Sequence, residues 1–189
     1  DRRDELYEEY LAQPAHVRAE IIGGTLYVLP RPGPRHTNVA SGVGGELRSP
    51  FQRGRGGPGG WWILGEPELH LSLKEPIVPD VAGWRVERMP ALPETAYFTL
   101  PPDWVCEVVS RSTERIDREE KLPYYAAHRV GHVWLIDPID KRLEIYALGD
   151  DGTWRTVRVH EGDDAVRAEP FDAIELDLAG LWSPPSAPR

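Results

Sequence analysis

Hydrophobic and polar residues alternate along much of the chain in the pattern of short strands, interrupted by three stretches with helical spacing. The helical stretches are Glu5–Gln13, His36–Leu47 and a segment from about Glu114 to His128. Apolar residues three and four positions apart mark one face of a helix, whereas a period of two marks a half-buried strand. The predicted strands are Arg18–Ile22, Thr25–Leu29, Trp61–Leu64, Glu68–Leu73, Val81–Val86, Trp104–Val109, His132–Ile136, Arg142–Leu148, Thr153–His160 and Ile174–Leu178.

Glycine and proline divide these elements. Gly23-Gly24 suits the two-residue turn of a hairpin between the first two strands. The segment RGRGGPGG, residues 53–60, predicts a loop without regular structure, and Pro123 should kink the third helix or reset its start. The resulting order of helices and strands predicts an α/β or α+β fold, in which helices pack on one mixed sheet accompanied by additional antiparallel strands.

A buried strand carries the first chemical signal. Trp104–Val109, WVCEVV, is a nearly continuous apolar run interrupted only by Glu107, as expected for a strand covered on both faces. Strand alternation places Cys106 and Glu107 on opposite faces, so Cys106 is expected to be a small core residue. Burying the carboxylate of Glu107 without a partner would cost several kcal/mol, so this group must be solvated, paired or bound to a cation.

Two further segments place ionisable groups beside apolar ones. They are Asp80, within Pro79-Asp80-Val81, and the helical row Asp117, Lys121 and Tyr125. If Asp80 and Glu107 lie on neighbouring strands, they would most simply share Mg²⁺ or Mn²⁺, which prefer carboxylate oxygen ligands. A nearby lysine could then orient or deprotonate a water and stabilise the charge of an attacked phosphate.

Each of these residues also has a plain structural interpretation. Asp80 could cap a turn, and Glu107 could be the buried partner of an arginine or of Lys121. Asp117 and Lys121 are four residues apart and could form a surface pair contributing ~0.3–0.5 kcal/mol. Tyr125 is expected to pack its ring against the sheet, with its hydroxyl group near the site.

Composition limits the partners and the compartment. The 189 residues fit one domain, residues 1–189, and 22 Lys and Arg against 31 Asp and Glu give a net charge of -9. This balance argues against a broad electrostatic grip on nucleic acid but permits a local basic strip, for which Arg53 and Arg55 are candidates. One cysteine, no apolar run long enough to span a membrane and no export signal predict a cytoplasmic protein without membrane association.

Several motifs, taken in order, resemble the Uma2 endonuclease family. They are PIVPDV, WVCEVVSRST and DREEKLPYYAAHRVGHVWLIDP, with EIIGGTLYVLPRPGPRH before them and LAGLW near the end. The resemblance covers most of the chain. It implies the restriction-endonuclease-like fold of the PD-(D/E)xK superfamily, a mixed sheet flanked by helices.

The resemblance assigns roles residue by residue. Asp80 matches the aspartate of the PD element and Glu107 the acidic residue of (D/E)xK, so both are expected to be catalytic and to bind the metal. Val109 stands where the superfamily has its lysine, and Lys121 in the following helix takes the place that Uma2-like sequences use. Glu20 matches an acidic residue of the N-terminal element and is expected to complete the metal site or bind a second ion.

The supporting residues and the function follow from the same resemblance. His36 is expected either to contact a phosphate or to begin a helix, and Tyr125, Arg53 and Arg55 are further candidates for supporting or binding substrate. The expected activity is Mg²⁺-dependent hydrolysis of phosphodiester bonds in DNA, with Mn²⁺ as an alternative ion, by a homodimer. Two other functions stay open: a noncatalytic dimeric interaction protein, and a metal-dependent hydrolase of a small phosphorylated substrate, which a pocket too narrow for a duplex would favour.

Overall fold

The computed structural model describes residues 1–183, and most predicted elements are present with shifted ends. The helices, including two π-helical turns (η), are α1 (Arg2–Leu11), α2 (Pro34–Leu47), η1 (Arg48–Gln52), α3 (Glu114–Ile116), η2 (Asp117–Lys121), α4 (Leu122–Ala127) and α5 (Leu178–Trp182). The strands are β1 (Arg18–Ile22), β2 (Thr25–Leu29), β3 (Trp61–Gly65), β4 (Leu69–Ser72), β5 (Glu75–Ile77), β6 (Val81–Arg85), β7 (Trp104–Val108), β8 (His132–Asp137), β9 (Arg142–Leu148), β10 (Trp154–Glu161), β11 (Ala165–Val166) and β12 (Leu176–Asp177).

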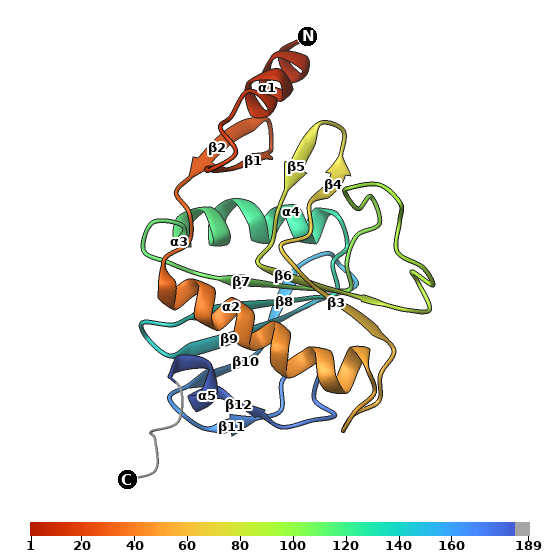
Figure 1. The fold of residues 1–189 in the computed structure, drawn as a ribbon, viewed down its shortest axis with the longest axis vertical. Coiled ribbons are helices and arrows are strands. Elements are labelled where there is room, and N and C mark those ends of the chain that lie inside the picture. Colours follow the sequence, from red (N-terminus) through yellow and green to blue (C-terminus); the bar gives the residue numbers. More distant parts are fainter. Residues whose placement is uncertain (184–189) are drawn as a thin grey trace.

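Six strands form a mixed sheet in the order β10-β9-β8-β7-β6-β3 (Figure 1). Neighbouring strands are antiparallel except β7 and β8, which are parallel and are joined by α3, η2 and α4. A parallel pair requires such a crossover connection, since its strands cannot be joined by a tight turn. The prediction of a mixed sheet with packed helices is therefore confirmed.

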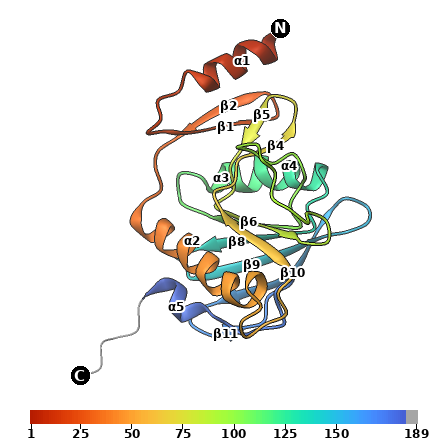
Figure 2. The same cartoon turned by 45° about the vertical axis from the view of Figure 1, so that its right-hand side comes forward.

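Helices cover both faces of this sheet (Figures 1 and 2). Side chains of α2 and α5 pack in one apolar cluster and those of α4 in a second. Strand alternation assigns Trp104, Cys106 and Val108 of β7 to the α2 cluster and Val105 to the α4 cluster. Glu107, between Cys106 and Val108, therefore faces α4, and the predicted separation of Cys106 from Glu107 is confirmed.

An N-terminal hairpin lies outside the six-stranded sheet, together with α1 (Figure 2). Its strands β1 and β2 meet at Gly23 and Gly24, whose φ angles of 57° and 74° are those that a tight hairpin turn requires. The hairpin packs against β5 of a second small hairpin, β4–β5. Glu20 of β1 is completely buried by this packing.

The structure corrects several boundaries. The predicted helix from Glu114 to His128 is three consecutive segments, with the wider π-helical turn η2 placed immediately before α4. Pro123 explains this, because it has no N–H group to donate within the helix and occupies a first-turn position of α4. Strand β5 was not predicted, and α1 begins at Arg2 rather than Glu5 because Asp1 caps it through its side chain.

Glu144 of β9 holds the crossover segment against the sheet. Its carboxylate receives two hydrogen bonds from the Arg118 guanidinium, at 2.9 and 2.7 Å, and lies 2.9 Å from Nη2 of Arg142. Tyr146 also donates to it through its hydroxyl group. The hydrogen bonds from Arg118 are the main reason that the pKa of Glu144 is lowered to about 2.

Replacing Glu144 by glutamine should lower the free energy of unfolding at neutral pH by about 1–2 kcal/mol, since solvent screens part of the pairing. The folded-state pKa of about 2 lies below the ordinary value of 4.5, so the carboxylate stabilises the fold above pH 4.5 and this contribution is lost as the pH falls toward 2. The stability difference between wild type and Glu144→Gln should shrink over that interval, as measured by urea unfolding.

The matched control is Glu175→Gln, which removes an exposed carboxylate outside this network. Its effect should stay small at every pH. If the stability difference between wild type and Glu144→Gln does not change with pH, the stabilising role of the ionised Glu144 carboxylate is wrong.

Candidate active site

Asp80 and Glu107 meet at one end of the sheet. Val81 pairs with Cys106 and Ala82 with Val105 in the antiparallel register of β6 and β7, so the same register places Asp80 opposite Glu107. The backbone N–H of Val108 donates to Oδ2 of Asp80 at 2.7 Å. The two carboxylates are 3% and 1% exposed. The structure thus brings together the two residues expected to share a metal.

Lys121 reaches the same point from η2. Its ammonium lies 3.1 Å from Oε1 of Glu107, 3.1 Å from Oε2 of Glu20 and 3.8 Å from Oδ1 of Asp117. Lys121 and Asp117 are 2% and 3% exposed, so the interpretation of these two residues as a surface pair is wrong. The N-terminal hairpin packs on this turn through the ion pair between Glu20 and Lys121. The spacing of four residues within the helix could not predict this burial, because it does not show which other segment packs there.

Glu20 and Tyr125 complete the buried cluster. Glu20 accepts a hydrogen bond from the backbone N–H of Val78 at 3.0 Å, which fixes its carboxylate beside Lys121. The Tyr125 hydroxyl donates to Oε1 of Glu107 at 2.5 Å, while its ring packs in the α4 cluster. Tyr125 therefore packs and contacts the site at once, as expected.

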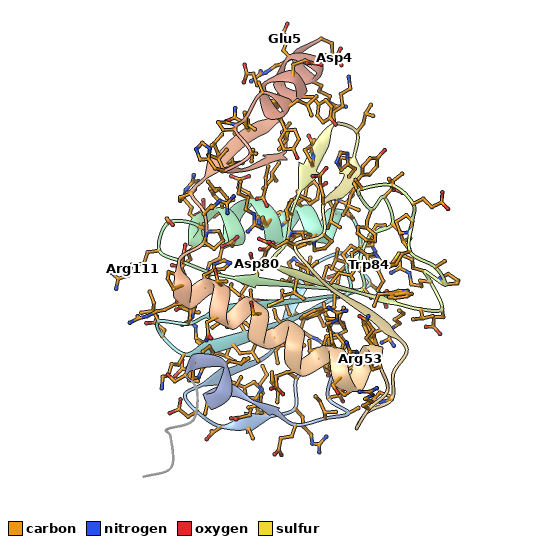
Figure 3. The ribbon with its side chains drawn as sticks, in the orientation of Figure 1. Asp4, Glu5, Arg53, Asp80, Trp84 and Arg111 are labelled. Carbon is orange, nitrogen blue, oxygen red and sulfur yellow. The ribbon has the colours of Figure 1, made fainter. Side chains whose placement is uncertain are left out.

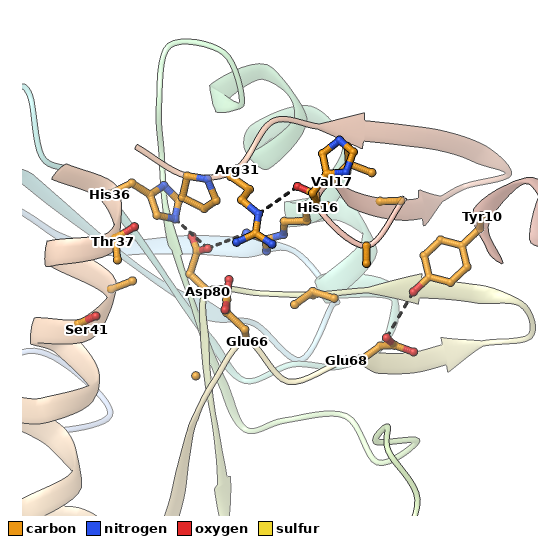
Figure 4. Close-up of a pocket in the computed structure, with 17 residues that line it drawn as sticks. Tyr10, His16, Val17, Arg31, His36, Thr37, Ser41, Glu66, Glu68 and Asp80 are labelled. Carbon is orange, nitrogen blue, oxygen red and sulfur yellow. Dashed lines mark hydrogen bonds and ion pairs between the residues drawn. The ribbon is translucent and has the colours of Figure 1, made fainter. Parts of the chain in front are cut away.

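Arg18 is the member of the site that the sequence interpretation missed. Its Nη1 donates to Oδ1 of Asp80 at 2.9 Å, and its Nη2 lies 3.3 Å from Oε1 of Glu20. His36 Nε2, at the start of α2, also lies 2.9 Å from Oδ1 of Asp80 (Figure 4). The signal was present, because Arg18 and Glu20 are two apart on a predicted strand and so share one face.

Burial and charge act in opposite directions on these groups. Burial raises the pKa of Glu107 to about 8, although the charge of Lys121 opposes this rise. Burial would also raise the pKa of Asp80, but the contact with His36 and the charge of Arg18 outweigh it and hold that pKa well below its usual range. The pKa of Lys121 is raised, because Glu107 and Glu20 outweigh the effect of its own burial.

A cavity of about 690 Å³ opens beside Asp80, between the N-terminal hairpin and the first turns of α2 (Figure 4). Asp80, Arg18 and His36 line it, whereas Glu20, Glu107 and Lys121 lie behind them. Arg18 therefore stands at the boundary between the cavity and the buried carboxylates.

Arg53 and Arg55 lie elsewhere. They follow η1 at the far end of α2, and Figure 3 shows Arg53 well separated from Asp80. Neither arginine lines the cavity. A substrate contact by these two residues stays a prediction and would have to occur at a distance from Asp80.

The carboxylates are not arranged as a ready-made metal cage. Within residues 1–183, no three or more His, Cys, Asp or Glu side chains form a group that could hold a metal ion. Four buried carboxyl groups, those of Glu20, Asp80, Glu107 and Asp117, nevertheless share two Lys or Arg side chains, Arg18 and Lys121, with His36 as a further contact of Asp80. Oε2 of Glu20 is buried and lies outside hydrogen-bond geometry despite the nearby Lys121. The cluster therefore has more acidic groups than Lys and Arg side chains, and their oxygen atoms are the donors that a hard divalent cation prefers.

No helix within residues 1–183 combines the length and hydrophobicity needed to cross a membrane.

Comparison with known proteins agrees with this geometry. Residues 5–179 match the Uma2 family, described as "Putative restriction endonuclease". The structure resembles a crystal structure of a "putative nuclease belonging to DUF820" from Anabaena variabilis ATCC 29413, with a TM-score of 0.72 and 21% identity over 93% of this chain and 96% of that chain. At this identity the likeness shows the fold alone. No curated protein gives a significant match. Family and fold together support a nuclease, and because the family match spans nearly the whole chain, the chain belongs to the Uma2 family.

Proposed function

We propose that this protein is a metal-dependent endonuclease that hydrolyses phosphodiester bonds in DNA. The observation that carries the proposal is the meeting of Asp80, Glu107 and Lys121 at one end of β6 and β7. Asp80 directly precedes β6, Glu107 lies in β7 and Lys121 in η2, and the resemblance of the sequence to the Uma2 family assigns a role to each of them, with Lys121 in place of the lysine that Val109 replaces. Their juxtaposition beside a cavity gives a phosphodiester a place to react.

Asp80 and Glu107 would hold Mg²⁺ or Mn²⁺, with Glu20 as the third carboxylate. Such an ion would polarise the phosphate and lower the pKa of a bound water, which is the general contribution of divalent metals to hydrolysis. The number of buried carboxyl groups and the Oε2 atom of Glu20, which has an ion-pair contact but no hydrogen bond, support this assignment. Arg18 now occupies the space between Asp80 and Glu20 and would have to leave these carboxylates first.

Side chains around the proposed metal site would have separate roles in the reaction. The Lys121 ammonium is held by Glu20 and Glu107, where it can orient the attacking water and offset charge on the phosphate. Tyr125 fixes the orientation of Glu107 through its hydroxyl group. In the hydrolysis, the water oxygen bonds to phosphorus, the bond to the leaving sugar oxygen breaks, and that oxygen gains a proton. His36, which lines the cavity 2.9 Å from Asp80, is placed to contact the phosphate.

A noncatalytic interaction protein is the second candidate, because ion pairs already engage each of these carboxylates. On that view the cluster only stabilises the fold. The two functions differ in one measurable respect, since only the nuclease needs a divalent cation.

Purified wild type should cleave DNA in Mg²⁺ or Mn²⁺ and should be inactive in chelator. Asp80→Asn should lower the cleavage rate by a factor of at least ~100, because it removes a ligand of the metal that would stabilise transition-state charge. The measurement is the initial rate on labelled single-stranded, duplex and branched DNA.

Lys121→Met should show the same loss of cleavage rate. Because this change removes a buried cation, circular dichroism is needed to confirm that the variant is folded. Arg155→Gln, at an exposed position of the edge strand β10, is the control and should keep the wild-type rate. If wild type cuts no DNA and binds no divalent ion, the nuclease proposal is wrong and the noncatalytic function gains support.

Arg18→Met should tighten Mn²⁺ binding roughly tenfold, because it removes a cation that competes for Asp80 and Glu20. Isothermal titration of the metal-free protein with MnCl₂ measures the dissociation constant directly and does not depend on catalysis. Arg155→Met makes the same change in net charge away from the cluster and should leave the constant unchanged. Equal or weaker Mn²⁺ binding by Arg18→Met would show that Arg18 does not occupy the cation's place.

A further inference from the structure

We infer that the cavity beside Asp80 receives a single unpaired nucleic-acid strand, so that single-stranded and flapped substrates are cut in preference to continuous duplex. The cleavage preference rests on the proposed nuclease function, whereas the strand-binding site can be tested separately. The inference is built from the access to Asp80, the size of the cavity and the side chains on its walls.

Access to the carboxylates is restricted. Asp80 is 3% exposed, and Glu107 and Glu20 are still less exposed. Of these three residues only Asp80 lines the cavity. A phosphodiester must therefore enter the cavity to approach the site, rather than slide across an open face of the sheet.

The size of the cavity suits one strand. Its volume of about 690 Å³ lies within the ~300–1,000 Å³ typical of pockets that enclose small organic ligands. One nucleotide unit belongs to that size class, but a double helix does not, since its major groove alone is ~12 Å wide. A duplex would have to bend or open to place a phosphate beside Asp80. Bending a site by 40–90° costs on the order of 1–6 kcal/mol, which a flexible unpaired strand avoids.

One part of the wall can bind phosphate. Arg18, Arg31 and His36 all line the cavity. Nε of Arg31 donates to the backbone oxygen of His16 at 3.0 Å, and within residues 1–183 we see no carboxylate paired with this guanidinium. Its remaining N–H groups suit the paired hydrogen bonds that arginine makes to a phosphate.

The other part of the wall can bind an unpaired base. Tyr10 of α1 lines the cavity, with its hydroxyl group donating to Glu68 at 3.3 Å, and Glu66 lines it closer to Asp80 (Figure 4). Tyr10 and the cationic side chains lie on different parts of the same cavity, and a site that offers both an aromatic ring and cationic groups can bind an unpaired strand, with stacking worth ~1–3 kcal/mol per base. The Glu66 carboxylate can accept hydrogen bonds from the amino groups of a base. In a duplex these amino groups are engaged in base pairing, so Glu66 favours an unpaired base.

The overall charge supports the same conclusion. Binding to a duplex gains most of its affinity from many phosphate contacts by Lys and Arg. A net charge of -9 opposes contacts spread over a long duplex. The cavity is lined by the acids Asp80, Glu66 and Glu68 as well as by Arg18 and Arg31, so its positive charge is confined to one part of the wall, where one or two phosphates of a single strand would lie.

The first test compares one DNA sequence as a single strand, as a full duplex and as a duplex with an unpaired flap, in Mn²⁺. We expect kcat/KM to be at least ~10-fold higher for the single strand and the flap than for the duplex, with cuts confined to the unpaired arm. Equal or faster cleavage of the duplex would overturn the inference. The inference would also be overturned if the protein cleaved bis(p-nitrophenyl) phosphate and cleaved the three DNA forms at equal rates. That result would indicate a site for small phosphodiesters.

The second test measures binding without cleavage, by fluorescence anisotropy of the labelled single strand in chelator. Arg31→Gln and Tyr10→Leu should each weaken binding roughly tenfold, while Arg155→Gln should not change it. If no DNA is cut but wild type still binds the single strand more tightly than duplex and Arg31→Gln abolishes the difference, the nuclease proposal fails and the strand site stands. Equal affinities for single strand and duplex would overturn the strand site whatever the cleavage result.

Discussion

The ammonium of Lys121, buried between Glu20 and Glu107, is the contact on which the site depends. It joins the N-terminal hairpin to β7 and to the crossover between β7 and β8, about a hundred residues later in the sequence. Burying these charges is costly, and the cost is recovered only if each charge finds a close partner. The hairpin is not part of the six-stranded sheet, so its ion pairs to Lys121 and Asp80 help to fix its place. The cavity depends on this placement, because the hairpin forms one of its walls.

The same contacts create a conflict between stability and catalysis. The pairs made by Arg18 and Lys121 stabilise the metal-free protein, yet Arg18 uses carboxylate oxygens that a metal would need. Four buried carboxyl groups exceed these two cationic partners, and the raised pKa of Glu107 shows that burial favours retaining a proton there. A cluster built only for stability would not need this excess of acids, since replacing buried charges with apolar residues is often neutral or stabilising. The excess of acidic groups supports the proposed cation site.

Much of the fold could be predicted from local pattern, and the site only in part. Alternation within WVCEVV placed Glu107 and Cys106 on opposite faces, because strand geometry permits no other arrangement. Asp80 and Lys121 were candidates because they are ionisable groups beside apolar segments, and the family resemblance assigned their roles, since Val109 gives no lysine at the usual position. The burial of Lys121 could not be predicted from its helix, because the covering hairpin is about a hundred residues earlier in the sequence.

Other features failed for similar reasons. Arg18 was overlooked although it shares a strand face with Glu20. Its role in the site depends on its hydrogen bond to Asp80, which lies 62 residues away in the sequence. Pro123 was expected to kink the crossover helix or reset its start, and α4 does begin at Leu122, but the π-helical form of the preceding turn η2 was not predicted. A π-helical turn also changes which side chains share a face, and η2 is the turn that presents Asp117 and Lys121. Local sequence thus indicated the groups, while long-range packing decided their partners.

The net charge of -9 seemed at first to argue against any nucleic-acid partner, and the structure refines that argument. Glu20, Asp80, Glu107 and Asp117 contribute to this charge but are buried, so they do not repel phosphates across the outer surface as exposed acids would. Their partners Arg18 and Lys121 also lie inside the protein, and Arg18 lines the cavity. A cation bound to these carboxylates would release Arg18 from Asp80 and Glu20 next to an incoming phosphate. Metal binding and strand binding would then favour each other through one arginine, in a protein whose remaining surface has little attraction for DNA.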